Sequence, residues 1–224
     1  MKLFALITAG GEGRRMGSGV PKQFLELDGR PILMHSIQAF LNYAPDMELV
    51  VVLPEDWFGP WKALCQTHRF MARHRLAISG PTRFHSVKNG LRQVPGEALV
   101  AIHDGARPLL PLSVISRVFE NARKFGNAIP VTEPGDSLRT VEGAMSAPLD
   151  RMKVRLVQTP QCFHAGEIKK AYERNFHESF TDDATVLEAA GGRLFLVDGS
   201  RENIKITTPT DIILARGILS ERAS

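Results

Sequence analysis

A glycine-rich stretch with basic residues, placed directly after a short apolar run, constrains this chain more than any other feature. The run from Leu3 to Ile7 predicts a buried strand, and the stretch that follows it reads Thr-Ala-Gly-Gly-Glu-Gly-Arg-Arg-Met. Glycines let successive backbone N–H groups approach and surround an anion. Arg14, Arg15 and Lys22 add positive charge close by. The stretch therefore predicts a phosphate-binding loop, with the triphosphate of a nucleotide as the obvious ligand.

Two familiar phosphate loops do not fit this stretch. The dinucleotide fingerprint Gly-x-Gly-x-x-Gly would need a glycine where the chain has Met16, and Pro21 would interrupt the helix that follows it. The P-loop needs Gly-Lys-Ser/Thr, whereas Lys22 stands between Pro21 and Gln23. A nicotinamide dehydrogenase is therefore disfavoured. An ordinary glycine-rich turn with a solvated basic rim is the alternative to a phosphate loop.

The composition is that of a single globular domain, and a few extra cations around an anionic substrate would account for its mild positive charge. The 224 residues are 43% hydrophobic and 23% charged, and the formal charge of +4 comes without a Lys/Arg block of five or more, which gives nucleic-acid binding little support. Cys65 and Cys162 lie far apart and outside any Cys-x-x-Cys pair, which predicts free thiols in a reducing compartment. With no signal-peptide pattern and no apolar run near the roughly 18 residues of a membrane span, we expect a cytoplasmic protein.

Strand and helix patterns alternate through the first 130 or so residues. Apolar and β-branched runs predict strands at 3–7, 49–53, 76–78, 99–102 and 127–132. Apolar residues at helical spacing predict helices at 31–40, 57–72, 82–94 and 111–125. This alternation indicates an α/β fold with a mostly parallel sheet and helices on both faces. Ligands of such folds bind at the carboxyl ends of the strands, where the glycine loop and Asp104 both fall.

The alternation breaks after Glu133 and resumes near residue 166. Between 134 and 161 only the β-prone fragments 137–141 and 154–157 stand out, which predicts an arm or hairpin outside the main sheet. An arm with few contacts of its own needs a partner surface, so we expect a homodimer. Further helices are expected at 166–177, from Thr181 to Gly191 and from Thr208 onward, with strands at 194–197 and 204–207. Residues 1–224 then form one domain with an arm at about 134–158.

Four charged residues are candidates for chemistry. Asp104, at the end of a buried strand, is the best candidate ligand for a hard cation such as Mg²⁺, although it could instead cap the next turn or pair with Arg107. Arg15 and Lys22 suit a phosphoryl-type transition state, or are solvated surface charges. Lys205 alternates with Ile204 and Ile206 in the expected strand, so we expect it to face a cleft.

Other polar residues have ordinary structural explanations. His103 would point to the face of its strand opposite Asp104, which is typical of a hydrogen-bonded core histidine. Thr181-Asp182-Asp183 reads as a helix N-cap with acidic first-turn residues. Arg151 taken alone reads as a surface residue. No pair of histidines at i, i+4 occurs, so the histidines give no metal-binding signature, and without a Gly-x-Ser-x-Gly elbow a serine hydrolase is not supported.

Five motifs in order resemble one family over nearly the whole chain. The opening Ala9–Met16 with Pro21-Lys22-Gln23 is similar to sugar and polyol-phosphate nucleotidyltransferases. The motifs that narrow the resemblance are His103-Asp-Gly-Ala-Arg-Pro108, Thr159-Pro-Gln161, Thr181-Asp-Asp-Ala184 and Glu202-Asn-Ile-Lys-Ile-Thr207. Together they resemble the 2-C-methyl-D-erythritol 4-phosphate cytidylyltransferases of the non-mevalonate isoprenoid pathway.

The resemblance implies a Rossmann-like domain, a homodimer formed through the arm, CTP as substrate and Mg²⁺ as cofactor. Carried over by motif, Arg15 and Lys22 would stabilise the transition state at the α-phosphate, and Asp104 would bind the metal. Arg151 and Lys205 would position the acceptor for attack. The residues implied to hold CTP are Thr8, Ala9, Gly10, Gly11, Gly13, Gly80, Arg83, Ser86 and Gly105.

The arm contains one departure from the family pattern. Ser137 is an implied acceptor-binding residue, and it stands where the family often has threonine, with the hydroxyl retained. The nearest rival is a ribitol-5-phosphate cytidylyltransferase, which would share the nucleotide motifs and differ in its acceptor. A catalytically silent nucleotide-binding module would not need Lys22, Asp104 and Lys205 together.

Overall fold

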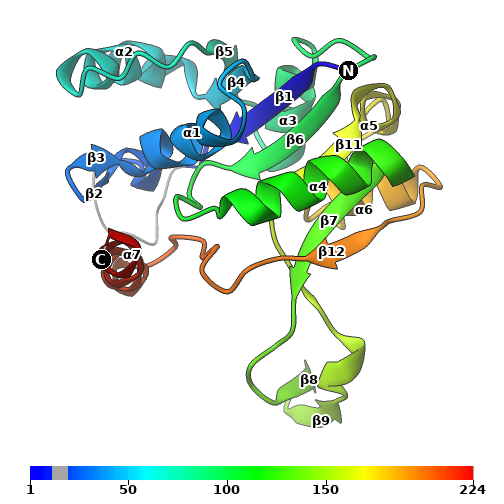
Figure 1. Ribbon diagram of the computed structural model, residues 1–224. Helices are drawn as coiled ribbons and strands as arrows, with labels where there is room; N and C mark the ends of the chain where they lie inside the picture. Colours follow the sequence, from blue (N-terminus) through cyan, green and yellow to red (C-terminus); the bar gives the residue numbers. More distant parts are fainter. Residues whose placement is uncertain (12–19, 224) are drawn as a thin grey trace.

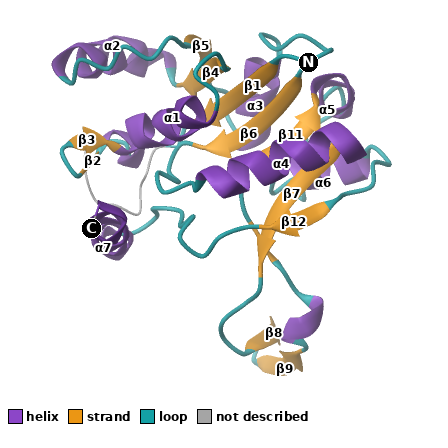
Figure 2. Ribbon diagram, viewed as in Figure 1, coloured by secondary structure: helices purple, strands orange, loops and turns teal. Residues whose placement is uncertain are grey.

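A mostly parallel, twisted sheet forms the centre of the computed structural model, which describes residues 1–11 and 20–223 (Figures 1 and 2). The strands of the sheet lie in the order β10-β7-β11-β6-β1-β4-β5, with β12 beside β7. Their bounds are Leu3–Thr8 (β1), Glu48–Leu53 (β4), Arg75–Ile78 (β5), Leu99–Asp104 (β6), Asn127–Thr132 (β7), Leu156–Val157 (β10), Gln161–His164 (β11) and Leu196–Asp198 (β12).

Strand direction places the carboxyl ends of the first strands at one edge of the sheet. β1 pairs in parallel with both β4 and β6, and β4 pairs in parallel with β5. In this register Thr8, the last residue of β1, lies opposite Asp104, the last residue of β6. β11 and β10 run antiparallel to their neighbours. The glycine stretch and Asp104 therefore emerge side by side, as the alternating pattern predicted.

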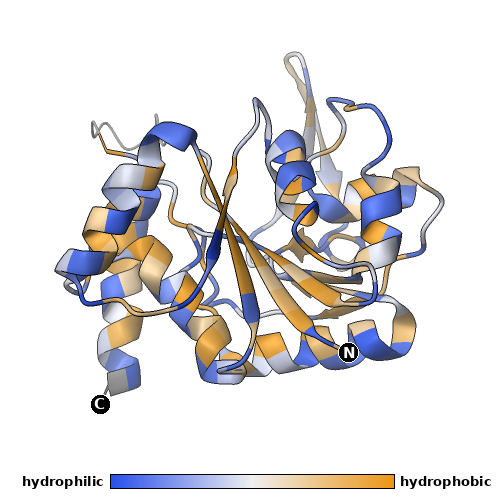
Figure 3. Cartoon of the chain, turned by 90° about the horizontal axis from the view of Figure 1, so that it is seen from above, coloured by the Kyte–Doolittle hydropathy of each residue, from blue (hydrophilic) through white to orange (hydrophobic). Residues whose placement is uncertain are grey.

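Helices cover both faces of the sheet because successive side chains of each strand point to opposite sides. The odd-numbered core residues of β1 and β4 pack against one set of helices, and the even-numbered ones pack against the other. The first set is α1 (Ile32–Tyr43), α2 (Phe58–Thr67) and α4 (Leu112–Phe125), and the second is α3 (Arg83–Leu91), α5 (Ala165–Ala171) and α6 (Asp183–Ala189). In Figure 3 the apolar strands lie between helices of mixed polarity. The predicted α/β fold is confirmed.

Local sequence signals set several helix ends. α4 ends at Phe125 and is capped by Gly126, which adopts a positive φ of 90° that costs glycine little. α6 begins with a reciprocal capping box between Asp182 and Thr185, which confirms the predicted N-cap. α2 ends at Thr67, short of the expected residue 72, because the chain turns at Arg69 with φ 49°.

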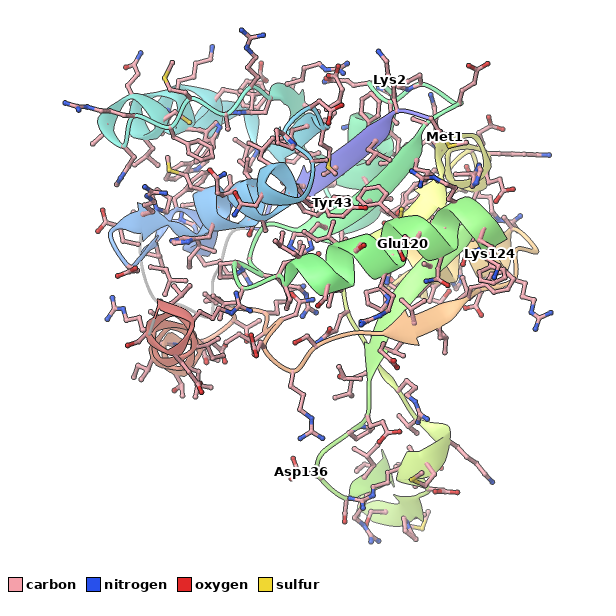
Figure 4. All side chains as sticks on the ribbon, viewed as in Figure 1. Met1, Lys2, Tyr43, Glu120, Lys124 and Asp136 are labelled. Atoms are coloured by element: carbon pink, nitrogen blue, oxygen red, sulfur yellow. The ribbon has the colours of Figure 1, made fainter. Side chains whose placement is uncertain are left out.

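The arm leaves the body of the molecule after β7 (Figure 1). It consists of β8 (Leu138–Glu142) and β9 (Met145–Leu149), which form their own two-stranded sheet, and a 3₁₀ turn at Arg151–Lys153. Asp136 lies on this arm, away from the helices (Figure 4). The predicted hairpin is therefore present. The expectation that 154–157 also lies outside the main sheet is wrong, because Leu156 and Val157 pair with β7.

Two further expectations near the C-terminus are corrected. The predicted helix at 166–177 ends at Ala171, where the buried Tyr172 turns its hydroxyl toward Asp183. Residues 204–207 form no strand. The apolar alternation there reflects packing of Ile206 in a third cluster beneath α7 (Pro209–Ala223) and the hairpin of β2 (Glu26–Leu27) and β3 (Arg30–Pro31). Among the described helices, none is long and apolar enough to cross a membrane.

Candidate active site

A cleft of about 930 Å³ opens at the carboxyl ends of β1, β4, β5 and β6. Each of these strands, or the loop that follows it, contributes to the lining. Most of the sequence-predicted residues within the described part of the chain meet here. Those that line the cleft are Thr8, Ala9, Gly10, Gly11, Lys22, Gly80, Arg83, Ser86, Asp104 and Lys205.

Close backbone packing shapes the nucleotide side of this cleft. A Cβ on Gly10 would lie 2.8 Å from the Cβ of Ser79, and one on Gly80 would lie 2.4 Å from the Cβ of His85. Glycine is therefore required at both positions. The hydroxyl of Ser86 accepts a hydrogen bond from the Gly80 N–H at 3.0 Å and so fixes the loop that follows β5.

The turn that carries Lys22 is anchored on both sides. The buried side chain of Gln23 donates a hydrogen bond to the carbonyl of Ala9 at 2.6 Å, which ties the turn to the glycine stretch. Phe24 stacks on Trp57 with ring centroids 4.5 Å apart. Trp57 also lines the cleft, although its place at the start of the expected helix 57–72 gave no sign of this role. Lys22 therefore projects from a rigid support.

Asp104 is the centre of a cluster of cations. Lys205 Nζ lies 2.8 Å from Oδ2, Arg83 Nε lies 3.3 Å from Oδ1, and Arg107 Nε lies 3.7 Å from Oδ2. Burial alone would raise the pKa of Asp104, but the charges of Arg83, Lys205 and Arg107 outweigh it and hold the pKa well below its usual range. Asp104 is thus ionised at any physiological pH, and it pairs with Arg107 as well as facing the cleft.

Arg83 is fixed by a second carboxylate, whose sequence position indicated only an acidic first-turn residue of a helix. Its two terminal nitrogens bind Asp183 at 2.9 and 2.7 Å, and Tyr172 donates its hydroxyl hydrogen to the same carboxylate at 2.6 Å. Asp183 is fully buried. Arg83 and Asp183 are 100 residues apart, so no local signal could have revealed this pair.

Three described site residues lie away from the cleft lining, and two others are not among the described residues. Gly105 does not line the cleft but packs behind it, where its N–H donates to the Thr8 carbonyl at 2.9 Å. Ser137 and Arg151 lie exposed on the arm, with the Arg151 guanidinium 3.5 Å from the Gly135 carbonyl. Arg15 and Gly13 lie outside the described residues.

His103 is a hydrogen-bonded core histidine, as its strand position predicted. It is fully buried, with Nδ1 3.1 Å from the Thr159 hydroxyl and Nε2 3.1 Å from the Arg107 carbonyl. Burial lowers the pKa of His103 from 6.5 to about 4. The pKa values of His35 and His74 are also lowered by burial.

Acid should destabilise the fold through His103. The unfolded chain takes up a proton below about pH 6.5, whereas the folded imidazole does so only near pH 4, so stability is lost between these values. We expect the free energy of unfolding to fall by about 2–3 kcal/mol from this residue between pH 7 and 4.5. Urea titrations at both pH values measure the loss. The free energy of unfolding of His103→Gln should change less with pH, and an equal loss in this variant would contradict the assignment. The stabilisation from Asp104 stays constant in this window and adds nothing to the loss, because its depressed pKa makes that stabilisation fall only below the unfolded value near 4.

Residues 3–221 match the model of the IspD family, described as 2-C-methyl-D-erythritol 4-phosphate cytidylyltransferase. The chain belongs to the IspD family. This confirms the resemblance that the five motifs indicated.

Relatives of the IspD family match the chain over nearly its full length. The 2-C-methyl-D-erythritol 4-phosphate cytidylyltransferase of Bacteroides thetaiotaomicron is 46% identical over 98% of this chain and 100% of its own. That of Bacteroides fragilis is 47% identical over 96% of this chain and 98% of its own. The crystal structure of the Thermus thermophilus cytidylyltransferase is 32% identical and superimposes with a TM-score of 0.80, covering 97% of this chain and 98% of that one.

Proposed function

We propose that this chain transfers CMP from CTP to 2-C-methyl-D-erythritol 4-phosphate, releasing pyrophosphate, in the non-mevalonate isoprenoid pathway. Membership of the IspD family over residues 3–221 is the observation that carries this proposal. The relatives described above are named for this acceptor, and their names do not favour ribitol 5-phosphate as the acceptor of this chain. Mass spectrometry of the product tests the proposal: the expected species is the acceptor plus CMP joined through a diphosphate. Hydrolysis of CTP to CMP without that species would contradict it.

The reaction needs positioning and charge neutralisation rather than a general base. An oxygen of the acceptor phosphate, already ionised at neutral pH, forms a bond to the α-phosphorus of CTP. The bond from that phosphorus to its bridging oxygen breaks, and pyrophosphate leaves with the electron pair. Negative charge develops on the α-phosphate oxygens, where fixed cations stabilise it most effectively. Lys22, together with Arg15, is proposed to supply these cations.

A divalent cation such as Mg²⁺ belongs to this proposal, with Asp104 as its protein ligand. Mg²⁺ commonly takes one or two carboxylates and completes its shell with water and substrate phosphates. The ionised Asp104 carboxylate at the cleft fits this role, and within residues 1–11 and 20–223 no cluster of three His, Cys, Asp or Glu offers a closed metal cage. Such an ion, when bound, would neutralise charge on the phosphates of CTP.

We also propose that the protein acts as a homodimer in which the arm of one chain serves the cleft of the other. Within one chain, Ser137 and Arg151 lie on the arm and are not among the described residues that line the cleft. The arm also exposes large apolar side chains, including Val141 (74% exposed) and Met145 (72% exposed), which a partner surface would cover.

The two free cysteines support a reducing, cytoplasmic setting.

Replacing Arg151 with alanine should raise the KM for the acceptor about tenfold or more and leave the KM for CTP nearly unchanged, because an arginine on the arm is proposed to bind the acceptor phosphate. Steady-state kinetics with each substrate varied in turn measure the effect. An unchanged KM for the acceptor would remove Arg151 from the acceptor site.

Mixing two variants tests whether the arm acts across the dimer. If Arg151→Ala and Lys22→Ala chains are unfolded together and refolded, a mixed dimer carries one site with an intact arm and an intact cleft. At equal mixing, about a quarter of all sites should then have both groups intact and regain activity at acceptor concentrations well below the raised KM of Arg151→Ala. Should the arm instead serve its own cleft, the mixture would show no more activity than the two variants separately.

A further inference from the structure

Lys205 faces the cleft although its segment belongs to no strand. The chain between β12 and α7 passes beside the end of β7 without regular structure (Figure 1). Lysine side chains have several rotatable bonds, so a defined position for the ammonium depends on a fixed backbone. The backbone is held on the C-terminal side by Ile206, which is fully buried and donates its N–H to the Ala106 carbonyl at 2.8 Å.

Asn203 supplies the corresponding anchor on the N-terminal side. It is fully buried, and its side-chain amide donates to the Thr159 carbonyl at 2.8 Å and lies 3.4 Å from the Gln158 side-chain oxygen. Its own carbonyl accepts a hydrogen bond from Arg107 at 2.7 Å. Arg107 is also one of the cations around Asp104. Asn203 thus links the segment of Lys205 both to the backbone at Thr159 and to Arg107 of the Asp104 cluster.

The base of the arm takes part in the same contacts. Gln158 follows β10, where the arm rejoins the sheet, and its side chain donates to the Ser200 carbonyl at 2.8 Å and accepts from the Ser200 N–H at 3.2 Å. Gly199 permits this approach, because a Cβ there would lie 2.5 Å from the Gln158 side-chain oxygen. The turn that leads into Asn203 is therefore fastened to the sheet by the Gln158 side chain and by the Gly199 N–H, which donates to the Val131 carbonyl at 2.8 Å.

We propose that Asn203 is a positioning residue for Lys205: its buried side-chain amide fixes the backbone from which the lysine reaches Asp104 and the acceptor. Asn203 is not among the residues that line the cleft, so it acts through Lys205 rather than on the substrate. The inference rests on the proposed function of Lys205 as an acceptor-positioning residue.

A double-mutant cycle separates this role from a general loss of stability. Asn203→Ala should lower kcat/KM for the acceptor about 10–100-fold, the size of effect expected when a reacting group is displaced by about 1 Å. The KM for CTP should stay within about twofold, because Gly10, Gly80 and Ser86 lie on other segments of the chain, two on loops and Ser86 on α3. In a Lys205→Met background, Asn203→Ala should lower kcat/KM for the acceptor by less than about twofold further, since the lysine that Asn203 positions is already absent.

Asn127 offers a matched control. It is equally buried (3% exposed), and its side chain likewise fastens a loop, donating to the Arg193 carbonyl at 2.9 Å and accepting from the Phe195 N–H at 3.0 Å. Asn127→Ala should therefore lower Tm about as much as Asn203→Ala but leave the kinetic constants unchanged. Equal kinetic losses in both asparagine variants, or equal losses from Asn203→Ala in the wild-type and Lys205→Met backgrounds, would overturn the proposal.

A crystal structure of the Asn203→Ala variant gives a readout that does not depend on turnover. We expect the Lys205 ammonium to leave its place beside Asp104 by more than about 1 Å. An unchanged lysine would overturn the positioning role even if the enzyme is active. Failure of the wild-type protein to form product would instead contradict the proposed function, and the crystal structure would still decide whether Asn203 fixes Lys205.

Discussion

Lys22→Ala should lower kcat about 100–1,000-fold while leaving the KM for CTP within about threefold. The reason is that a preorganised cation stabilises the charge that develops in the transition state more than it stabilises the bound nucleotide. The support for this lysine is rigid, with Gln23 tied to Ala9 at 2.6 Å and Phe24 stacked on Trp57. Initial rates of pyrophosphate release at varied CTP measure both constants. Arg15→Ala is expected to behave in the same way.

Lys62→Ala is a suitable control for this experiment. Lys62 lies exposed on α2, and its loss removes the same charge without touching the lining of the cleft. Its kinetic constants should match those of the wild type. Near-normal turnover of Lys22→Ala would exclude Lys22 from transition-state stabilisation.

Asp104→Asn should reduce activity about 1,000-fold, the other large effect that we expect. The substitution removes the proposed ligand of the divalent cation and leaves the positive charges of Arg83, Arg107 and Lys205 without their shared carboxylate. Stability should also fall, by about 2–3 kcal/mol, less than for a fully buried pair because the Lys205 side chain is 41% exposed. Pyrophosphate release and urea unfolding measure the two effects.

Asp46→Asn controls for the loss of a carboxylate at an exposed position away from the cleft, and it should leave activity intact. Circular dichroism establishes that the Asp104→Asn variant is folded under assay conditions. A folded variant that retains more than a tenth of the wild-type activity would show that Asp104 neither holds a metal ion nor organises the cations.

The sequence allowed the architecture of the cleft to be predicted because its signals are local. A continuous apolar run predicts β1, and the rule that parallel strands end at one edge of a sheet brings the glycine stretch and Asp104 together. The structure places Thr8 opposite Asp104 in this way. The capping residues expected from the sequence, Asp182 before α6 and Gly126 after α4, mark the helix ends in the structure.

Contacts between distant parts of the chain could not be predicted in the same way. The Arg83–Asp183 pair depends on how α3 and α6 meet across a separation of 100 residues. Lys205 was expected to face the cleft from a strand, and it does face the cleft, but from an irregular segment held by Asn203 and Ile206. Alternating isoleucines satisfy a strand pattern and a packed loop equally well, so periodicity alone could not distinguish them.

The identity of the acceptor is tested most directly by the rate of pyrophosphate release. The purified protein is given CTP and Mg²⁺ with either 2-C-methyl-D-erythritol 4-phosphate or ribitol 5-phosphate. We predict rapid release with the first acceptor and release no faster than the acceptor-free control with the second. Faster release with ribitol 5-phosphate would contradict the proposed substrate while leaving the fold and the nucleotide site in place. No release above the control with either acceptor would contradict the proposed reaction itself.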